Sequence, residues 1–362
     1  MTTADLTTDT KPAAGKRNWL EIVSAIWAWI FLAVLIVFFS IVGEGFLSLR
    51  NFQNILANMA ILAILAFGQT FVIIAAGIDL STGFVMGMVS VVSAMAMTSL
   101  PPEWPLFLIV LVGALVGIGA ALIAGLVNGL LIARLNVPPF IATLGMFGIA
   151  RGVGFLLSDG MPIPIQISNL GQLGNGYLAY FHADTGLSWF VRPGNLERTQ
   201  LREVQSFVPF VVIIMLVLLL IAHIVLSRTK FGLYTYALGG SQEASLRAGI
   251  PVVRTLTSIY LVSATFAALA GIVYNLRFTN GAANAGEALL LDSIAAVVIG
   301  GASLFGGAGT VLGSLIGALI IAVLANGLVI MAINPFWQFI AVGIVIIVAV
   351  IIDQAREGVA HG

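Results

Sequence analysis

Seven polar side chains that could contact a small solute or an ion lie within or beside long apolar runs of this sequence. They are Asn58, Gln69, Asp79, Ser81, Asn128, Asp292 and Asn326. A polar or ionisable group in an apolar surrounding is costly, so it usually faces a water-filled cavity or a specific partner. These residues are therefore candidates for a polar pathway through the protein.

Most of these residues also have a purely structural interpretation. Asp79 is followed by Ser81 and Thr82, so its carboxylate could lie at a helix start and accept bonds from free backbone N–H groups. Asp292 could do the same at the start of a later helix. Amides such as Asn128 and Asn326 could bridge neighbouring helices. The sequence alone leaves both interpretations open.

Several other chemistries lack the residues they need. Cysteine is absent, and the only histidines are His182, His223 and His361, so neither a thiolate site nor an imidazole metal site is expected. An HExxH pair and the phosphate-binding pattern GxxxxGK[ST] are both missing. We therefore predict no metal site and no cofactor, and we expect that any ATP used is bound by a partner chain.

The composition indicates which solvent surrounds these residues. The chain has 362 residues, of which 60% are hydrophobic and 8% charged, with 15 basic and 15 acidic side chains. A soluble domain carries about 25% charged residues. The composition excludes an ordinary soluble enzyme, a disordered chain and a nucleic-acid binder, which would need a basic face. It is typical of a protein embedded in membrane lipid.

Apolar runs predict an all-α, polytopic membrane bundle of about ten transmembrane helices, since each span needs about 20 apolar residues. The first run is too long for a signal peptide and lacks a small-residue cleavage site. The expected spans are 24–43, 55–76, 82–99, 105–133, 138–157, 207–226, 255–275, 289–304, 310–333 and 335–352. Eight spans would fit the charge pattern equally well.

Two hydrophilic segments and two tails complete this organisation. With the N-terminus inside, nine Lys and Arg residues fall in cytoplasmic segments and five outside, which supports two cytoplasmic termini. We expect tails at 1–23 and 353–362 around a transmembrane domain at 24–352. We also expect an external loop at 158–206 and a cytoplasmic loop at 227–254.

Glycine is abundant, with 40 residues, and is often spaced by four within the expected spans. Such spacing lets helix backbones approach closely in lipid. The segment Ile299–Ser314 contains six glycines in sixteen residues, including Gly306 and Gly307, and AAGIDLSTG occupies 75–83. Because each glycine costs about 1 kcal/mol in a helix relative to alanine, we predict discontinuous helices at both places. Transporters build their pathways from such segments, so we also expect Gly306 and Gly307 to line the pathway.

The cytoplasmic loop contains GGSQEASLRAGIP, which is typical of a short helix between two breakers. Gly239 and Gly240 would end the preceding element, and Ser241 would cap the helix. Glu243 and Arg247 are four residues apart, so they can pair along one face. A short amphipathic helix of this kind either docks in a groove of another protein or lies on the membrane surface.

At this point the sequence resembles a known family. AAGIDLSTG, ALGGSQEASLRAGI and LDSIAAVVIGGASLFGGAGTVLGSLIGALI are similar to the hallmark segments of bacterial ABC-transporter permeases of the ribose, xylose and arabinose importer class. The similarity runs in order from about residue 50 to residue 352. The N-terminal tail and the 158–206 loop match poorly, and the long external loop leaves the identity of the sugar open.

The resemblance implies a permease subunit in the bacterial inner membrane that moves a monosaccharide by alternating access. It implies three protein partners: a second permease copy, either identical or a companion, a cytoplasmic ABC ATPase, and a periplasmic sugar-binding protein. The surrounding lipid is the remaining partner. It also implies that a coupling helix contacts the ATPase through Gly239, Gly240, Glu243, Ala244, Arg247, Gly249 and Ile250.

One alternative function is an ion-coupled secondary transporter of a small polar solute, in which Asp79 or Asp292 would bind the coupling ion. A membrane-embedded enzyme is a third class, but the chain lacks a convergent catalytic set. We therefore expect a transport subunit that is not itself an enzyme.

Overall fold

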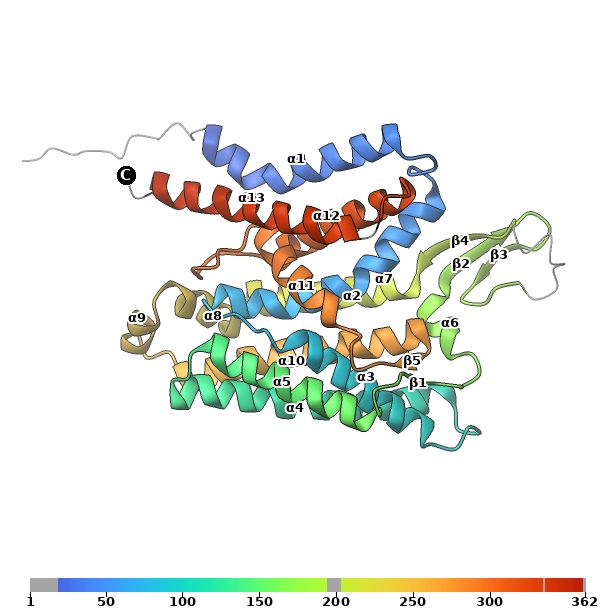
Figure 1. Cartoon of the computed structure of the whole chain (residues 1–362), viewed down its shortest axis with the longest axis horizontal. Helices are drawn as coiled ribbons and strands as arrows, with labels where there is room; N and C mark the ends of the chain where they lie inside the picture. Colours follow the sequence, from blue (N-terminus) through green and yellow to red (C-terminus); the bar gives the residue numbers. More distant parts are fainter. Residues whose placement is uncertain (1–18, 194–202, 335, 361–362) are drawn as a thin grey trace, which may run out of the picture.

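A computed structural model describes residues 19–193, 203–334 and 336–360. The helices run roughly along one common direction (Figure 1). Six of the described helices are long and apolar enough to cross a membrane, which makes the chain a multi-pass membrane protein. They are α2 (Leu49–Ile74), α4 (Leu106–Leu135), α5 (Pro139–Leu157), α7 (Phe210–Arg228), α10 (Val252–Phe278) and α12 (Val311–Ile330).

Four further helices coincide with the remaining expected spans. They are α1 (Trp19–Val42), α3 (Thr82–Thr98), α11 (Glu287–Ile299) and α13 (Phe336–Ala360). At 17 and 13 residues, α3 and α11 are shorter than the roughly 20 residues that a full span requires. Every predicted span thus contains a helix.

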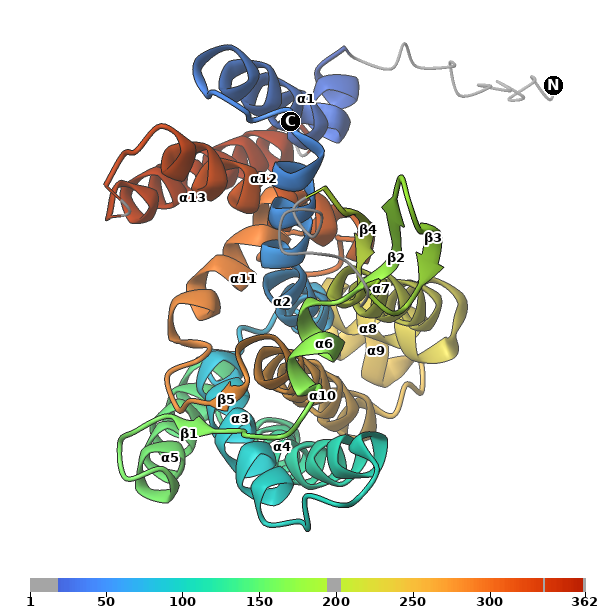
Figure 2. The same ribbon diagram turned by 90° about the vertical axis from the view of Figure 1, so that its right-hand side faces the viewer.

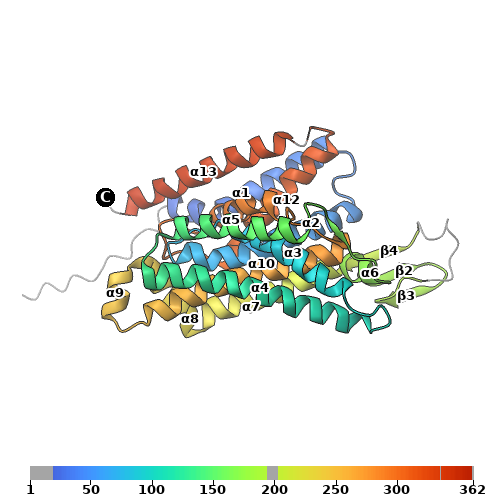
Figure 3. The same ribbon diagram turned by 60° about the horizontal axis from the view of Figure 1, so that its bottom comes forward.

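The two ends of the bundle differ in structure. At one end lie the short helices α8 (Lys230–Gly240) and α9 (Gln242–Arg247), and we call this the α9 end. At the other lie α6 (Leu170–Asn175) and a small sheet, and we call this the sheet end. The first residue of α1 and the last of α13 both lie toward the α9 end (Figures 1 and 3).

α2 forms the centre of the bundle. Viewed from the sheet end, it lies between α1 and α13 at one margin and α4 and α5 at the other (Figure 2). Ser48 caps its start by accepting a hydrogen bond from the backbone N–H of Asn51 at 3.3 Å. From Ile61 onward its sequence is apolar on all faces apart from Gln69 and Thr70, and such a helix is stable only when neighbours surround it.

Both predicted discontinuities are present. Residues 75–81 form a turn after α2, so that α3 starts inside the bundle, and residues 300–310 separate α11 from α12. The amino ends of α3 and α11 meet where Gly83 and Gly286 touch. A Cβ on either glycine would overlap the carbonyl oxygen of the other. Two short helices therefore begin against each other in the interior.

The prediction of an all-α fold missed two small sheets. β2 (Tyr177–His182) pairs antiparallel with β3 (Gly186–Trp189) and with β4 (Gln205–Pro209), giving the order β3-β2-β4. β1 (Ile163–Pro164) pairs with β5 (Asn280–Gly281). All but β5 lie in the expected 158–206 loop and at its border. Aromatic-rich YLAYFH favours a strand once a partner is available, which apolar-run counting does not register.

The glycine spacing predicted close helix contacts, and most of them exist. Gly87 faces the backbone of Ala283, Gly125 faces Tyr260 and Ala264 of α10, and Gly317 faces Ala296 of α11. On α5 the same spacing has another outcome, since an added Cβ at Gly148 or Gly152 would meet nothing within 4 Å. Gly148 and Gly152 therefore lie on an open face of α5.

Candidate functional site

Asp79 is the centre of a buried polar cluster between α2, α3, α4 and α10. Its side chain is 2% exposed. One carboxylate oxygen, Oδ1, accepts hydrogen bonds from the backbone N–H of Ser81 at 2.9 Å and from its hydroxyl at 2.6 Å. The other, Oδ2, accepts from the hydroxyl of Ser263 at 2.8 Å. The carboxylate therefore closes the turn before α3, as the structural interpretation predicts.

Two amides complete the cluster. Gln69 Nε2 donates to the carbonyl oxygen of Asp79 at 2.5 Å and to Thr82 Oγ1 at 3.1 Å. Asn128 Nδ2 donates to Ser81 Oγ at 3.0 Å. Four of the seven polar residues singled out from the sequence, Gln69, Asp79, Ser81 and Asn128, thus gather at one point. Ser263 belongs to the cluster as well, although serines are too common in apolar helices for the sequence to single it out.

The Asp79 carboxyl group is held by hydroxyl and backbone N–H groups rather than by a basic side chain. Within the described residues, no Lys, Arg or His forms an ion pair with Asp79. The amide oxygens Gln69 Oε1 and Asn128 Oδ1 are buried and have no hydrogen-bond partner there either. The hydroxyl and amide donors around the turn at 75–81 are the groups that stabilise the polar cluster.

The other polar candidates lie elsewhere. Toward the sheet end, Asn58 Oδ1 accepts from Arg277 Nη2 at 2.5 Å, and Asn326 Nδ2 donates to Asn51 Oδ1 at 3.0 Å. Both amides bridge helices. Asp292 is the sixth residue of α11 rather than its first, because α11 begins at Glu287, and its side chain is half-buried. The helix-start interpretation is therefore wrong for Asp292.

Gly306 and Gly307 lie at the α9 end, against the junction of α8 and α9. The backbone N–H of Gly307 donates to the carbonyl oxygen of Ile74, the last residue of α2, at 2.8 Å. A Cβ on Gly306 would lie 2.7 Å from the carbonyl oxygen of Gly239. A Cβ on Gly239 would overlap the carbonyl of Ile74. Three backbone segments thus meet without any side chain between them.

The segment after this junction folds as the sequence predicts. Gly240 ends α8, and Ser241 Oγ caps α9 by accepting from the N–H of Ala244 at 3.2 Å. Glu243 and Arg247 pair at 2.6 Å, and both side chains are exposed. Gly249 has a φ of +80°, which allows the chain to turn, and the N–H of Ile250 then donates to Ser245 at 3.0 Å. α9 therefore presents a charged, exposed face at this end.

Tyr236 ties α8 to the glycine-rich segment, and the sequence did not single it out. Its hydroxyl donates to the carbonyl oxygen of Gly309 at 2.7 Å. Burial raises the pKa of Tyr236 above its usual value, so the hydroxyl remains protonated and available as a donor. A small cavity of about 540 Å³ lies nearby, between the end of α2, residues 136–139 and the start of α9. It leaves space beside the junction.

The helices, the buried turn and the exposed α9 together define a class of protein. A multi-pass bundle with interrupted helices, a buried polar turn and an exposed helix at one end has the architecture of a membrane transport subunit. Within the described residues, no group of three or more His, Cys, Asp or Glu side chains could hold a metal ion.

Comparison with known proteins identifies the family. Residues 51–350 match the family described as branched-chain amino acid transport system / permease component, and the chain belongs to it. It is 35% identical to the ribose import permease of Bacillus subtilis, over 90% of this chain and 91% of the relative. It is 39% identical to the fructose import permease of Rhizobium meliloti, over 90% and 84%. For the xylose transport system permease of Escherichia coli the identity is 34%, over 90% of each chain. No solved structure matches.

Proposed function

We propose that this chain is the membrane permease subunit of an ATP-driven importer of a monosaccharide. The observation that carries the proposal is the length of the similarity. Relatives named as ribose, fructose and xylose permeases align with about nine tenths of the chain, at identities from 34% to 39%. Family membership and the interrupted bundle agree with a transport subunit that does not itself catalyse a reaction.

The proposal assigns a side of the membrane to each end of the bundle. The α9 end faces the cytoplasm, and the sheet end faces the periplasm of a bacterial inner membrane. On this proposal both termini are cytoplasmic. The distribution of basic residues supports this orientation. The transmembrane domain then covers 24–352, with about ten passes, of which α3 and α11 reach only part of the way.

A cytoplasmic ATPase would supply the energy. The chain has no phosphate-binding GxxxxGK[ST] segment, so ATP would have to be bound by another subunit. α9 is a short exposed helix with a fixed Glu243–Arg247 pair, and such a helix suits a groove on a partner. We assign ATPase coupling to Gly239, Gly240, Glu243, Ala244, Arg247, Gly249 and Ile250. A periplasmic binding protein would deliver the sugar.

A chain of contacts leads from α9 to the polar cluster. A displacement of α9 would move Gly239, which rests on the carbonyl of Ile74 and on the loop at Gly307. Ile74 ends α2 and is followed directly by the turn at 75–81 that Asp79 closes. The amino end of α3 would therefore shift with α9, which is how ATP binding would open or close a pathway shared with a second permease copy.

Uptake into liposomes tests the proposal. The chain is reconstituted with a partner ABC ATPase and a sugar-binding protein, and a panel of radiolabelled monosaccharides is supplied. We expect uptake that requires internal ATP and proceeds without an ion gradient. Uptake driven by a proton or sodium gradient alone would instead establish the ion-coupled alternative. Uphill accumulation or ATP hydrolysis by the chain without its partners would also contradict the proposal.

A further inference from the structure

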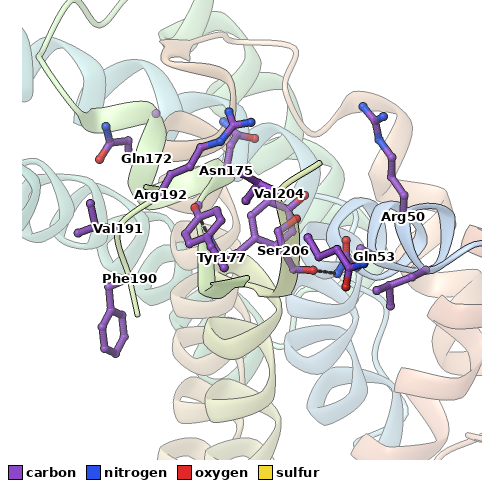
Figure 4. A pocket seen from close by; sticks show the side chains of 15 residues that line it. Arg50, Gln53, Gln172, Asn175, Tyr177, Phe190, Val191, Arg192, Val204 and Ser206 are labelled. Atoms are coloured by element: carbon purple, nitrogen blue, oxygen red, sulfur yellow. Dashed lines mark hydrogen bonds between the residues drawn. The ribbon is translucent and has the colours of Figure 1, made fainter. Parts of the chain in front are cut away.

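The sheet end contains a cavity of about 1160 Å³ that none of the sequence motifs indicated. The first turns of α2, helix α6 and the sheet β3-β2-β4 form its walls (Figure 4). It is lined by Leu49, Arg50, Gln53, Gly171, Gln172, Asn175, Gly176, Tyr177, Tyr180, Phe190, Val191, Arg192, Val204, Gln205 and Ser206. Small-molecule sites typically measure about 300–1,000 Å³, so a small solute fits here with some water.

Specific contacts fix the walls of this cavity. Gln53 Nε2 of α2 donates to the carbonyl oxygen of Ser206 in β4, as the dashed line in Figure 4 marks. Asn175 Nδ2 of α6 donates to the carbonyl oxygen of Arg277 at the end of α10, at 2.8 Å. Gly174 lies so close to the backbone at Leu276 that no side chain would fit there. The cavity is thus built between anchored elements, and little ordering would be required when a ligand binds.

The lining has the chemistry of a polyhydroxylated ligand. Amide groups come from Gln53, Gln172, Asn175 and Gln205, and guanidinium groups from Arg50 and Arg192. The first three amides each donate one hydrogen bond within the chain and keep their carbonyl oxygen and second N–H for a ligand. Planar amides and guanidinium groups can bond to two adjacent hydroxyls at once. Figure 4 draws Asn175, Arg192 and Tyr177 among the side chains around this cavity.

Aromatic rings supply the apolar part of the lining. Tyr177 and Tyr180 pack edge to face, with ring centroids 5.9 Å apart, and the Tyr180 hydroxyl accepts from the N–H of Tyr177 at 3.0 Å. Ring faces suit the C–H surface of a sugar. The lining contains no carboxylate among the residues that the structure describes, so it does not favour a cation.

We propose that this cavity is a receiving site for a neutral monosaccharide, which it holds after release from the binding protein and before entry into the bundle. The inference rests on the proposed function, which places the sheet end in the periplasm. The site needs only weak affinity, because a transport pathway must release its solute again.

The test measures sugar binding to the permease alone, in lipid nanodiscs without the ATPase or the binding protein. Saturation-transfer NMR is recorded with ribose, xylose and fructose in turn, and with gluconate as an acidic counterpart. We expect a saturable signal from at least one neutral sugar. A hydrogen bond to a neutral ligand contributes only modestly to affinity. The double variant Gln172→Ala/Arg192→Ala should therefore raise the dissociation constant for the sugar about tenfold. The control Gln166→Ala/Arg228→Ala removes the same side-chain types from exposed positions outside the lining and should leave it unchanged.

Other outcomes separate this inference from the proposed function. If the complete transporter takes up a sugar that gives no signal with the permease alone, the receiving site is wrong and the function stands. Binding of gluconate alone would contradict the neutral ligand. If Gln172→Ala/Arg192→Ala weakens docking of the binding protein but leaves the sugar signal intact, the cavity is a protein contact and the inference is overturned. Elution profiles and melting temperatures show whether both double variants fold.

Discussion

The two ends of this bundle are built in opposite ways. At the α9 end, Gly239, Gly306 and Gly307 bring two backbone segments into direct contact with each other and with the end of α2. At the sheet end, long polar side chains surround a cavity of about 1160 Å³. Backbone segments in direct contact move together when one of them is displaced, whereas side chains that line a cavity can move independently. The difference indicates a mechanical role for one end and a solute-contacting role for the other.

Gly239→Ala is expected to have the largest effect, because an added Cβ would overlap the carbonyl of Ile74 and lie 2.5 Å from the nitrogen of Gly307. Overpacking of this kind costs about 1–3 kcal/mol and would push α8 off α2. We expect ATP-driven uptake to be nearly abolished and the melting temperature to fall. Uptake and thermal unfolding are measured side by side.

The neighbouring glycine supplies the control for that variant. A Cβ on Gly240 would meet nothing within 4 Å in this chain, so Gly240→Ala should melt like the unmodified chain and lose far less uptake than Gly239→Ala. Equal losses in both variants would show that helix propensity, rather than close contact, matters at this junction.

Glu243→Lys is expected to have the next largest effect. It should change the coupling between ATP hydrolysis and uptake rather than the folding of the chain. It replaces the 2.6 Å pair with Arg247 by two like charges on the exposed face of α9. Exposed pairs contribute only about 0–1 kcal/mol, so the melting temperature should barely change. Uptake should fall severalfold, and hydrolysis by the ATPase should no longer respond to the loaded binding protein.

Exchange of the two charges isolates the partner's contribution. Glu243→Lys/Arg247→Glu restores attraction within α9 but reverses the charges that a partner meets. If this double variant regains normal coupling, α9 needs only its own stability, and the assigned contact with the ATPase at these two residues is wrong.

Local patterns in the sequence determined much of this architecture. Apolar runs located a helix in every expected span, and breakers with a cap located α9 between Gly240 and Pro251. Asp79 lay before Ser81 and Thr82, and this spacing is what closes the turn. Such features depend on residues within a few positions of one another, and for that reason they can be predicted.

Features that depend on distant partners were missed. The strands β2 and β4 are separated by more than 20 residues of sequence, and one wall of the cavity beside them is α6, which is anchored to α10. Gly306 was predicted to line a pathway, yet its neighbour is Gly239 in a different segment. Glycine spacing shows that a close contact is possible, but not with which element, so the open face of α5 at Gly148 and Gly152 was equally unexpected.

Asn128→Ala should have an intermediate effect, since the polar cluster lies between the two ends. The variant removes the 3.0 Å bond to Ser81 Oγ in a fully buried site. Loss of one buried hydrogen bond costs about 1–3 kcal/mol. We expect a lower melting temperature and partial loss of uptake, with the amount of ATP hydrolysed per sugar increased because the turn before α3 follows α9 less closely.

Asp79→Asn distinguishes a structural role of Asp79, in closing the turn before α3, from a role in binding a coupling ion. The amide keeps the shape of the side chain but cannot ionise, so ATP-driven uptake should decrease only partly and should stay independent of ion gradients. Dependence of unmodified uptake on a gradient, with complete loss in Asp79→Asn, would instead assign Asp79 to ion coupling.

Gln53→Met should have the smallest effect, and it tests whether the sheet end is outside the mechanical path. Methionine keeps the length of the side chain but removes the bond to the Ser206 carbonyl, at a cost of about 1 kcal/mol. We expect faster hydrogen exchange in β4 and at most a twofold decrease in uptake, while ATP hydrolysed per sugar stays constant. Gln166→Met, at an exposed position outside the cavity, is the control and should change neither quantity. If Gln53→Met alters the ratio of ATP to sugar as strongly as Glu243→Lys does, the sheet end transmits force too, and the division of roles between the two ends is wrong.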